Sequence, residues 1–228
     1  MNKLIAILSC TFMISCNHSI NKIKIDQDTK DILNLAFDNS IGSDTVWRYH
    51  FKIPPVNPAL FYNKKISRKE NLRFLKWQDS LRSILDTSEL FVVVNRKIDT
   101  LPTSEIIVIK EMLGSKNNFE YKMNGDTSFN ETLKALCSNR INMDTIDTKN
   151  LATQFNYKIY SDKFYPTDDF KKIGLLQFSQ VAFSNKRDKA AVYTSFYCGR
   201  LCGTGQILFY KKLNGKWKFI RKLDMWVS

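Results

Sequence analysis

Hydrophobic residues recur at helical spacing in the first part of the chain. Apolar positions three or four residues apart predict helices over residues 26–38, 67–85 and 127–138. The second of these helices begins with Ser67 and Glu70, which have the spacing of an N-terminal capping box. Residues 104–113 remain ambiguous, because their central apolar run favours a strand while their flanks favour a helix.

The spacing changes to two-residue alternation from residue 154 onward. Five strands are expected there, over residues 155–159, 173–183, 189–198, 206–212 and 216–227. Two further strands are expected earlier, over residues 45–53 and 90–95. Early helices followed by sequential strands indicate the α+β class, with N-terminal helices packed on a C-terminal antiparallel sheet, a meander of about five strands.

The last hairpin can be registered from its turn. Asn214-Gly215 is typical of a two-residue type I′ turn, because both residues tolerate positive φ. This turn pairs Lys212 with Trp217, Lys211 with Lys218, Tyr210 with Phe219, and Phe209 with Ile220. The face expected toward the core holds Leu208, Tyr210, Trp217, Phe219 and Leu223.

The extreme N-terminus has the pattern of an export signal. Lys3 precedes an apolar run over residues 4–14, which is long enough for a signal peptide and too short to span a bilayer. The segment Met13-Ile14-Ser15-Cys16 resembles the lipobox of bacterial lipoproteins, in which the signal is removed just before the cysteine and the cysteine is acylated. Alternatives are a lipobox ending at Cys10 and an ordinary secretory signal.

The lipobox resemblance implies a domain organisation and a location. Residues 1–15 would be the signal peptide, Cys16 the site of lipid (palmitate) attachment, residues 16–28 a tether, and residues 29–228 a single α+β domain. No Gly-, Ser- or Pro-rich linker divides the last of these. The protein is expected in the cell envelope, lipid-anchored on the periplasmic or outer-membrane face, with the membrane as one partner.

Composition limits the classes of function. The chain has 228 residues, 43% hydrophobic, which suits a folded domain and excludes collagen-like and disordered chains. Its net charge of +13 would suit an anionic partner, but an exported protein rarely meets nucleic acid, so none is expected. Abundant Lys, Asn and Ile are typical of AT-rich coding sequence, which explains much of this charge without a partner.

One loop stands out chemically. The stretch Tyr197-Cys-Gly-Arg-Leu-Cys-Gly-Thr-Gly205 holds three glycines, which indicates unusual backbone angles or a close approach. Cys198 and Cys202 are expected to form a disulfide in an exported protein. Partner contact is expected from the loop residues Gly199, Arg200, Gly203 and Gly205.

Other roles for the cysteines fit the sequence less well than this disulfide. Cys137 would remain a single thiol, or would pair with one of the loop cysteines instead. Redox catalysis fits poorly because the spacing is C-x-x-x-C, and a thiol nucleophile lacks a base because His18 and His50 are the two histidines of the chain. A metal site of the three cysteines with His50 has the spacing of no zinc finger.

The C-terminal segments together resemble a known group of proteins. Tyr197–Gly205, Asn214-Gly-Lys-Trp-Lys218 and Trp226-Val-Ser228 are similar to the C-terminal region of uncharacterised bacterial exported proteins and lipoproteins. That resemblance implies a fold and a location but no activity. A strand meander ending in a tryptophan-bearing hairpin also resembles nuclear-transport-factor-2-like and cystatin-like α+β folds.

The sequence contains no nucleotide-binding or hydrolase motif, so no cofactor and no catalytic residues are assigned. The function expected is that of a lipid-anchored binding module with a protein or glycan partner. Two alternatives stay open. One is an envelope enzyme, such as a glycan hydrolase with unidentified carboxylates, and the other is a structural or assembly subunit.

Overall fold

The computed structural model describes residues 25–43, 66–114, 127–138, 145–168, 171–199 and 202–228. Four α-helices lie in this part of the chain: α1 (Gln27–Ile41), α3 (Arg68–Thr87), α4 (Thr103–Gly114) and α6 (Asn130–Leu136). Two 3₁₀ turns, Thr127–Phe129 and Thr148–Asn150, accompany them. The proposed signal peptide, Cys16, the expected strand at 45–53 and Arg200 lie outside the described residues.

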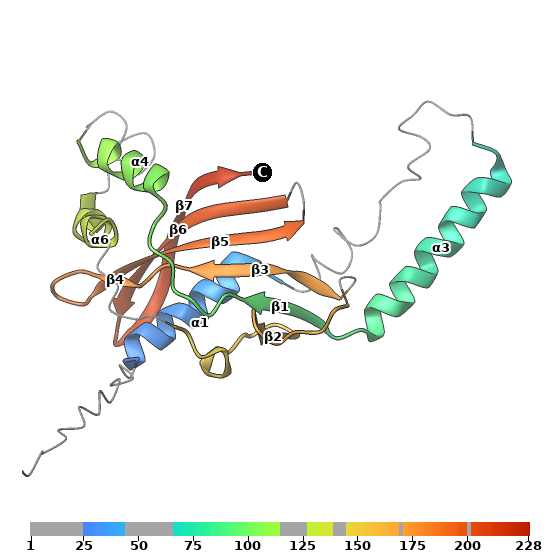
Figure 1. Cartoon of the computed structure of the whole chain (residues 1–228), viewed down its shortest axis with the longest axis horizontal. Helices are drawn as coiled ribbons and strands as arrows, with labels where there is room; N and C mark the ends of the chain where they lie inside the picture. The colour runs from blue at the N-terminus through green and yellow to red at the C-terminus, as the bar shows by residue number, and fades with distance from the viewer. Residues whose placement is uncertain (1–24, 44–65, 115–126, 139–144, 169–170, 200–201) are drawn as a thin grey trace, which may run out of the picture.

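A single mixed sheet forms the centre of the fold (Figure 1). Its strands are β1 (Leu90–Val94), β2 (Tyr157–Ser161), β3 (Lys172–Phe178), β4 (Ala182–Phe183), β5 (Lys189–Gly199), β6 (Cys202–Leu213) and β7 (Lys216–Val227). They are ordered β2-β1-β3-β5-β6-β7, with β4 beside β5. The α+β class with antiparallel C-terminal strands is therefore confirmed.

One part of the sheet was not anticipated. Strand β1 lies between β2 and β3 and runs parallel to both, so β2 pairs with β1 instead of opening the meander. All five residues of β1, Leu-Phe-Val-Val-Val, are buried. A strand that is apolar on both faces is stable in the interior of a sheet, where helices or loops cover both sides.

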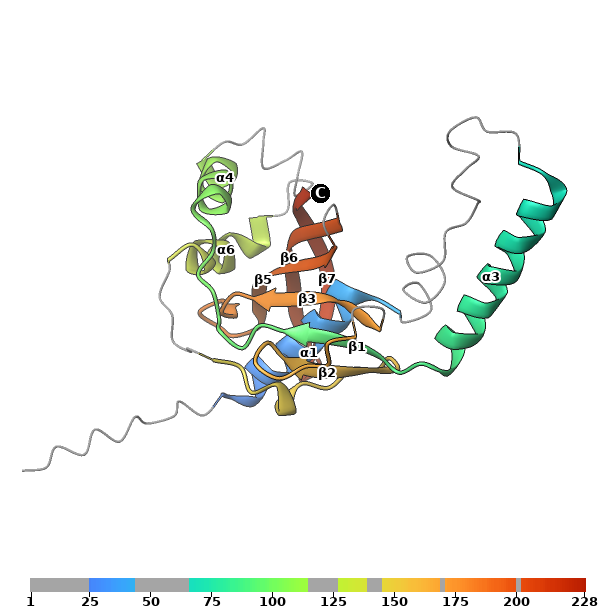
Figure 2. The same cartoon turned by 45° about the vertical axis from the view of Figure 1, so that its right-hand side comes forward.

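Helices cover the two faces of the sheet unequally. Helix α1 packs across one face, where its buried Ile32, Leu33 and Phe37 meet side chains of β1, β3, β5 and β6. On the other face, α4 and α6 cover only one end (Figures 1 and 2). Among the described residues, no helix covers the remainder of this second face over β3 and β5, and the candidate site lies there.

The ambiguous segment at 104–113 forms helix α4. Its buried residues Ile106, Ile109 and Met112 recur every three positions, so one side of a helix buries all of them against the sheet. In a strand the same residues would alternate between the two faces. Tertiary packing therefore selects the helix where the local pattern left both options open.

The predicted capping box begins helix α3. The backbone N–H of Ser67 donates to the Glu70 carboxylate (2.9 Å), and the backbone N–H of Glu70 donates to the Ser67 hydroxyl (3.2 Å). The helix extends away from the sheet in both views (Figures 1 and 2). No helix in the described ranges has the length and apolar character needed to cross a membrane.

The hairpin register is right near its turn and wrong beyond it. Asn214 and Gly215 both have positive φ (50° and 76°), as a type I′ turn requires, and the pairs from Lys212–Trp217 to Tyr210–Phe219 form as predicted. A bulge then shifts the register, so that Phe209 faces Arg221 instead of Ile220. The same bulge turns Leu223 to the opposite face, where it joins the core under α4 and α6.

Phe219 also departs from the prediction, because it lies on the expected face but is 39% exposed. Its ring packs edge-on against Tyr210, with 5.9 Å between centroids. The other residues expected in the core, Leu208, Tyr210, Trp217 and Leu223, are all buried.

Candidate functional site

The disulfide between Cys198 and Cys202 is present, with 5.2 Å between the two Cα atoms. It links the end of β5 to the start of β6, where Gly199 pairs with Cys202. Cys137 is a half-buried free thiol at the end of α6, and burial raises its pKa above the ordinary value. The rival pairing through Cys137 is therefore wrong.

The glycine-rich stretch is mostly strand rather than loop. Gly203 and Gly205 lie inside β6, and neither has a positive φ. Close approach is the reason for glycine here, because a Cβ on Gly205 would overlap the indole ring of Trp226. A Cβ on Gly203 would lie 3.1 Å from both Trp226 and Ser228. Of the expected contact residues, Gly199 is exposed at the hairpin end, whereas Gly203 and Gly205 are buried.

The Trp226 indole packs against the backbone of Gly203 and Gly205 and contacts two tyrosines. Its N–H donates to the Tyr193 hydroxyl (2.9 Å), and its ring is 5.4 Å from that of Tyr197 between centroids. Tyr197 is 44% exposed although Trp226 supports it. This part of the sheet thus presents an aromatic surface in which Trp226 packs beside Tyr197.

A hollow of about 250 Å³ lies beside this aromatic pair, on the sheet face that α4 and α6 leave open. Strands β3 and β5 form its floor, and the turn before α4 forms its wall. It is lined by Asp99, Thr100, Pro102, Gln177, Phe178, Ser179, Tyr193, Ser195 and Tyr197. Of these residues, Tyr197 alone belongs to the cysteine-containing stretch that the sequence singled out. The others were not identified from the sequence as site residues.

Hydrogen bonds fix the polar groups of the hollow. The Ser195 hydroxyl donates to the Gln177 side-chain oxygen (2.9 Å), which directs the amide nitrogen of Gln177 to other partners. The backbone N–H of Asp99 donates to the Phe178 carbonyl (3.1 Å), and this bond ties the main chain at Asp99 to the end of β3, beside the hollow. The hollow therefore combines a carboxylate, an amide and hydroxyl groups with an aromatic ring.

Tyr193 supplies a hydroxyl that stays protonated. Desolvation by burial raises its pKa to about 12, and the negative charge of Glu105 nearby acts in the same direction. Glu105 is itself buried, and it accepts a hydrogen bond from the Ser104 hydroxyl. At neutral pH the Tyr193 hydroxyl accepts from Trp226 and can donate its own proton, so it suits ligand binding rather than proton abstraction.

The chemistry of the hollow favours recognition. Asp99 is the one carboxylate among the described residues that line it, and the described part of the chain brings together no group of three potential metal ligands. Hydrolysis of a glycosidic bond generally uses two carboxyl groups that flank the bond. The groups present can donate and accept hydrogen bonds and stack against a ring.

Comparison of the chain with protein-family models, with curated proteins and with solved structures finds no match.

Proposed function

We propose that this protein is a lipid-anchored binding module of the cell envelope, and that the hollow on its sheet binds a sugar ring of an envelope glycan. The observation that carries the proposal is the exposed Tyr197 ring beside the hydrogen-bonding groups Gln177, Ser195 and Asp99. The lipid would be attached at Cys16, as the lipobox resemblance implies.

A pyranose ring has the two properties that this hollow would recognise. One face of the ring carries C–H groups that pack on an aromatic surface, while its hydroxyl and amide groups form hydrogen bonds at the rim. Tyr197 would supply the surface, and the contact with the neighbouring Trp226 ring would limit its motion. Gln177 and Asp99 would supply a donor and an acceptor.

The size of the hollow fits a small ligand unit. Sites for drug-sized ligands occupy about 300–1,000 Å³, and this hollow is smaller, at about 250 Å³. One ring would lie inside, and the remainder of a glycan chain would leave through the open side. The enzyme alternative is weaker because a second carboxylate would be needed opposite Asp99.

The test is saccharide binding by the variants Tyr197→Ala and Gln177→Ala. N-acetylated amino sugars, their short oligomers and neutral hexoses would be titrated against the protein while ligand NMR signals and tryptophan emission are followed. We expect binding of at least one saccharide class, weakened about tenfold by Tyr197→Ala, because the aromatic contact and its burial would be lost.

Phe219→Ala is the matched control, because Phe219 is also a partly exposed aromatic residue of the sheet but lies outside the hollow. It should leave saccharide affinity unchanged. The proposal fails if no saccharide binds, or if Tyr197→Ala and Phe219→Ala have the same effect.

A further inference from the structure

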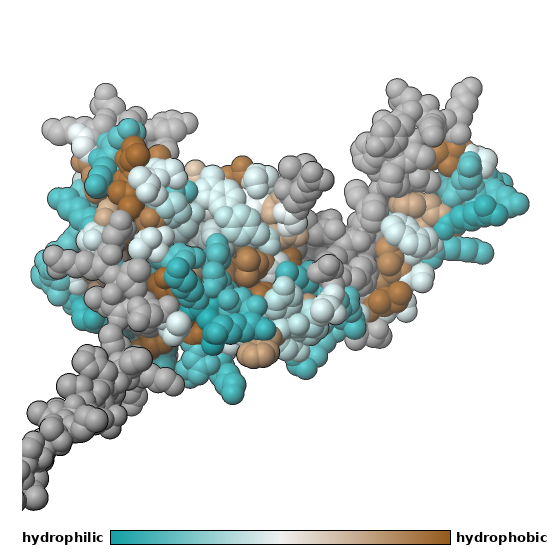
Figure 3. All heavy atoms as spheres, in the orientation of Figure 1, coloured by the Kyte–Doolittle hydropathy of each residue, from teal (hydrophilic) through white to brown (hydrophobic). Residues whose placement is uncertain are grey.

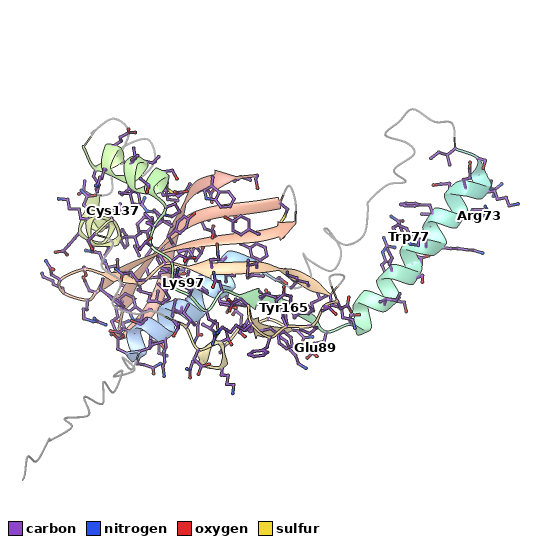
Figure 4. All side chains as sticks on the ribbon, viewed as in Figure 1. Arg73, Trp77, Glu89, Lys97, Cys137 and Tyr165 are labelled. Atoms are coloured by element: carbon purple, nitrogen blue, oxygen red, sulfur yellow. A yellow bond between two sulfur atoms is a disulfide. The ribbon has the colours of Figure 1, made fainter. Side chains whose placement is uncertain are left out.

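Helix α3 concentrates positive charge at its start. Within its first nine residues lie the four cationic side chains Arg68, Lys69, Arg73 and Lys76, against the single carboxylate Glu70. The remainder of the helix carries Arg82 against two acidic residues, Asp79 and Asp86, and there Arg82 forms an ion pair with Asp79 (3.3 Å). The helix therefore presents one strongly basic end on a segment that extends from the sheet (Figure 4, which labels Arg73).

The same end of α3 exposes large apolar side chains. Leu72, Leu75 and Trp77 are 50%, 44% and 46% exposed. The side of α3 that faces the protein interior is not the side that carries these apolar residues. On the interior side, Gln78 is buried and Leu81 packs against the main core. In Figure 3, apolar and hydrophilic surface lie side by side along α3.

The helical period places these two sets of side chains on one surface. At 100° per residue, Arg68, Leu72, Lys76, Lys69 and Arg73 follow one another within an arc of roughly 140°. These five residues also line a hollow of about 480 Å³. Leu75 and Trp77 lie at the two margins of this arc. The four cations and Leu72 can therefore meet a single flat partner together, while Leu75 and Trp77, about 160° apart around the helix, lie at the two edges of that contact.

We propose that the N-terminal half of α3 docks on an anionic phospholipid surface. Arginine and lysine would contact headgroup phosphates, while Leu72, which lies among them, would reach the boundary between headgroups and acyl chains and Leu75 and Trp77 would flank the contact at the level of the headgroups. Charge complementarity selects this partner, because the basic end matches a negatively charged bilayer, and tryptophan favours the membrane interface. This proposal shares with the proposed function only the location in the cell envelope. It requires neither acylation of Cys16 nor the proposed sugar site.

The test is vesicle binding by the unacylated mature chain, made from residue 16 onward with Cys16→Ser. Co-sedimentation would be measured with phosphatidylcholine vesicles and with vesicles containing about one-third phosphatidylglycerol. We expect binding to the anionic vesicles only. Reversal of two charges in Arg73→Glu/Lys76→Glu should weaken it at least tenfold, because each cation near such a surface contributes appreciably.

Three further variants test whether α3 itself, and not the general basicity of the chain, accounts for binding. Lys216→Glu/Lys218→Glu makes the same charge change at exposed lysines of β7 and should bind vesicles nearly as the parent does. Leu72→Ser/Leu75→Ser should also lose binding, and Trp77 emission should shift to the blue on anionic vesicles in the parent but not in Trp77→Phe.

Three results would overturn the proposal. The first is equal weakening by the α3 and β7 charge reversals, which would indicate non-specific attraction. The second is unchanged binding in Leu72→Ser/Leu75→Ser together with full competition by a soluble acidic polysaccharide, which would indicate a polyanion site. The third is self-association of the chain through α3 without vesicle binding. None of these results bears on saccharide binding, which the Tyr197 and Gln177 variants test separately.

Discussion

Glycine is required at position 205 because the Trp226 indole occupies the space of any side chain there. Glycine at position 199 has no such neighbour, since a Cβ there would lie 3.9 Å from the nearest atom, the Cβ of Cys202. The two positions belong to one glycine-rich stretch, yet their physical requirements differ. Alanine variants at the two positions can therefore be compared directly, with position 199 as the control for position 205.

Gly205→Ala should lower the free energy of unfolding by about 1–3 kcal/mol, because the added methyl group must displace the indole ring. Gly199→Ala should change it by less than about 0.5 kcal/mol. Urea denaturation followed by tryptophan emission measures both. Equal stability of the two variants would mean that Trp226 does not pack on β6 as described.

Asp28 joins the start of α1 to the last hairpin. One of its carboxylate oxygens accepts hydrogen bonds from the Lys212 ammonium group (2.6 Å) and the Trp217 indole N–H (2.9 Å). The bond to Lys212, aided by the bond to Trp217, holds the pKa of Asp28 below its ordinary value of 3.8. Because the folded-state pKa is lowered, the stabilisation is complete above the unfolded-state pKa and is lost as the pH falls through the folded-state pKa.

Asp28→Asn should therefore cost about 1–2 kcal/mol of stability at pH 7. The difference from the parent should shrink as the pH is lowered below 3.8, the ordinary value at which the unfolded state is protonated, toward the lower folded-state pKa. Denaturation at several pH values measures this. Asp79→Asn, at an exposed ion pair of α3, is the control; a pH-independent difference for Asp28→Asn would contradict the assignment.

At the scale of elements, sequence patterns succeeded where local interactions decide the structure. The capping box and the Asn214-Gly215 turn depend on neighbouring residues, and both formed as predicted. The predicted register is wrong beyond Tyr210, where a bulge shifts the pairing of β6 with β7. Such a bulge depends on packing against both faces of the sheet, which the turn sequence does not specify. The parallel position of β1 likewise depends on contacts with distant strands, which hydrophobic spacing does not specify.

The candidate site was harder to predict than the fold, because its walls come from separated parts of the chain. Asp99, Gln177 and Tyr197 meet only after β1, β3 and β5 have aligned. The hollow exists because α4 and α6 leave part of one face uncovered. The one available signal was the alternation of glycine in β6, which indicates that a large ring lies above the strand.

The disulfide hairpin gives a prediction at this scale. Replacing Cys198 and Cys202 together by serine should lower stability by roughly 2 kcal/mol, the loop-entropy estimate for so small a ring. The parent should lose a similar amount in reductant, and the double variant should be insensitive to it. Rapid alkylation of both thiols in protein isolated without reductant would contradict the pairing.

For the whole molecule, the proposed anchor predicts how processing depends on single cysteines. Cys16→Ala should leave unprocessed precursor and abolish incorporation of labelled fatty acid, because the modified thiol is absent. Cys10→Ala is the matched control and should be processed normally. Radiolabelling and gel mobility measure both. Acylation that persists in Cys16→Ala and is lost in Cys10→Ala would move the cleavage site.

A second membrane contact through α3 would change the behaviour of the anchored protein. The acyl chains that the lipobox resemblance implies at Cys16 would hold the protein stably, but through a single point of attachment. The basic end of α3 would add a second point of attachment and would limit rotation of the sheet about its tether. The saccharide site would then face a restricted range of directions.

Strand β7 is an outermost strand of the sheet in the described part of the chain, and it runs for twelve residues. An edge strand of this length presents unpaired backbone N–H and C=O groups to a neighbouring copy, and pairing along such edges is how aggregation begins. Lys216, Lys218 and Lys222 are exposed along it, and a copy docking alongside would bring its own lysines against them. Since tethering crowds molecules into two dimensions, this mutual repulsion would matter most on the bilayer, where it would keep adjacent copies dispersed.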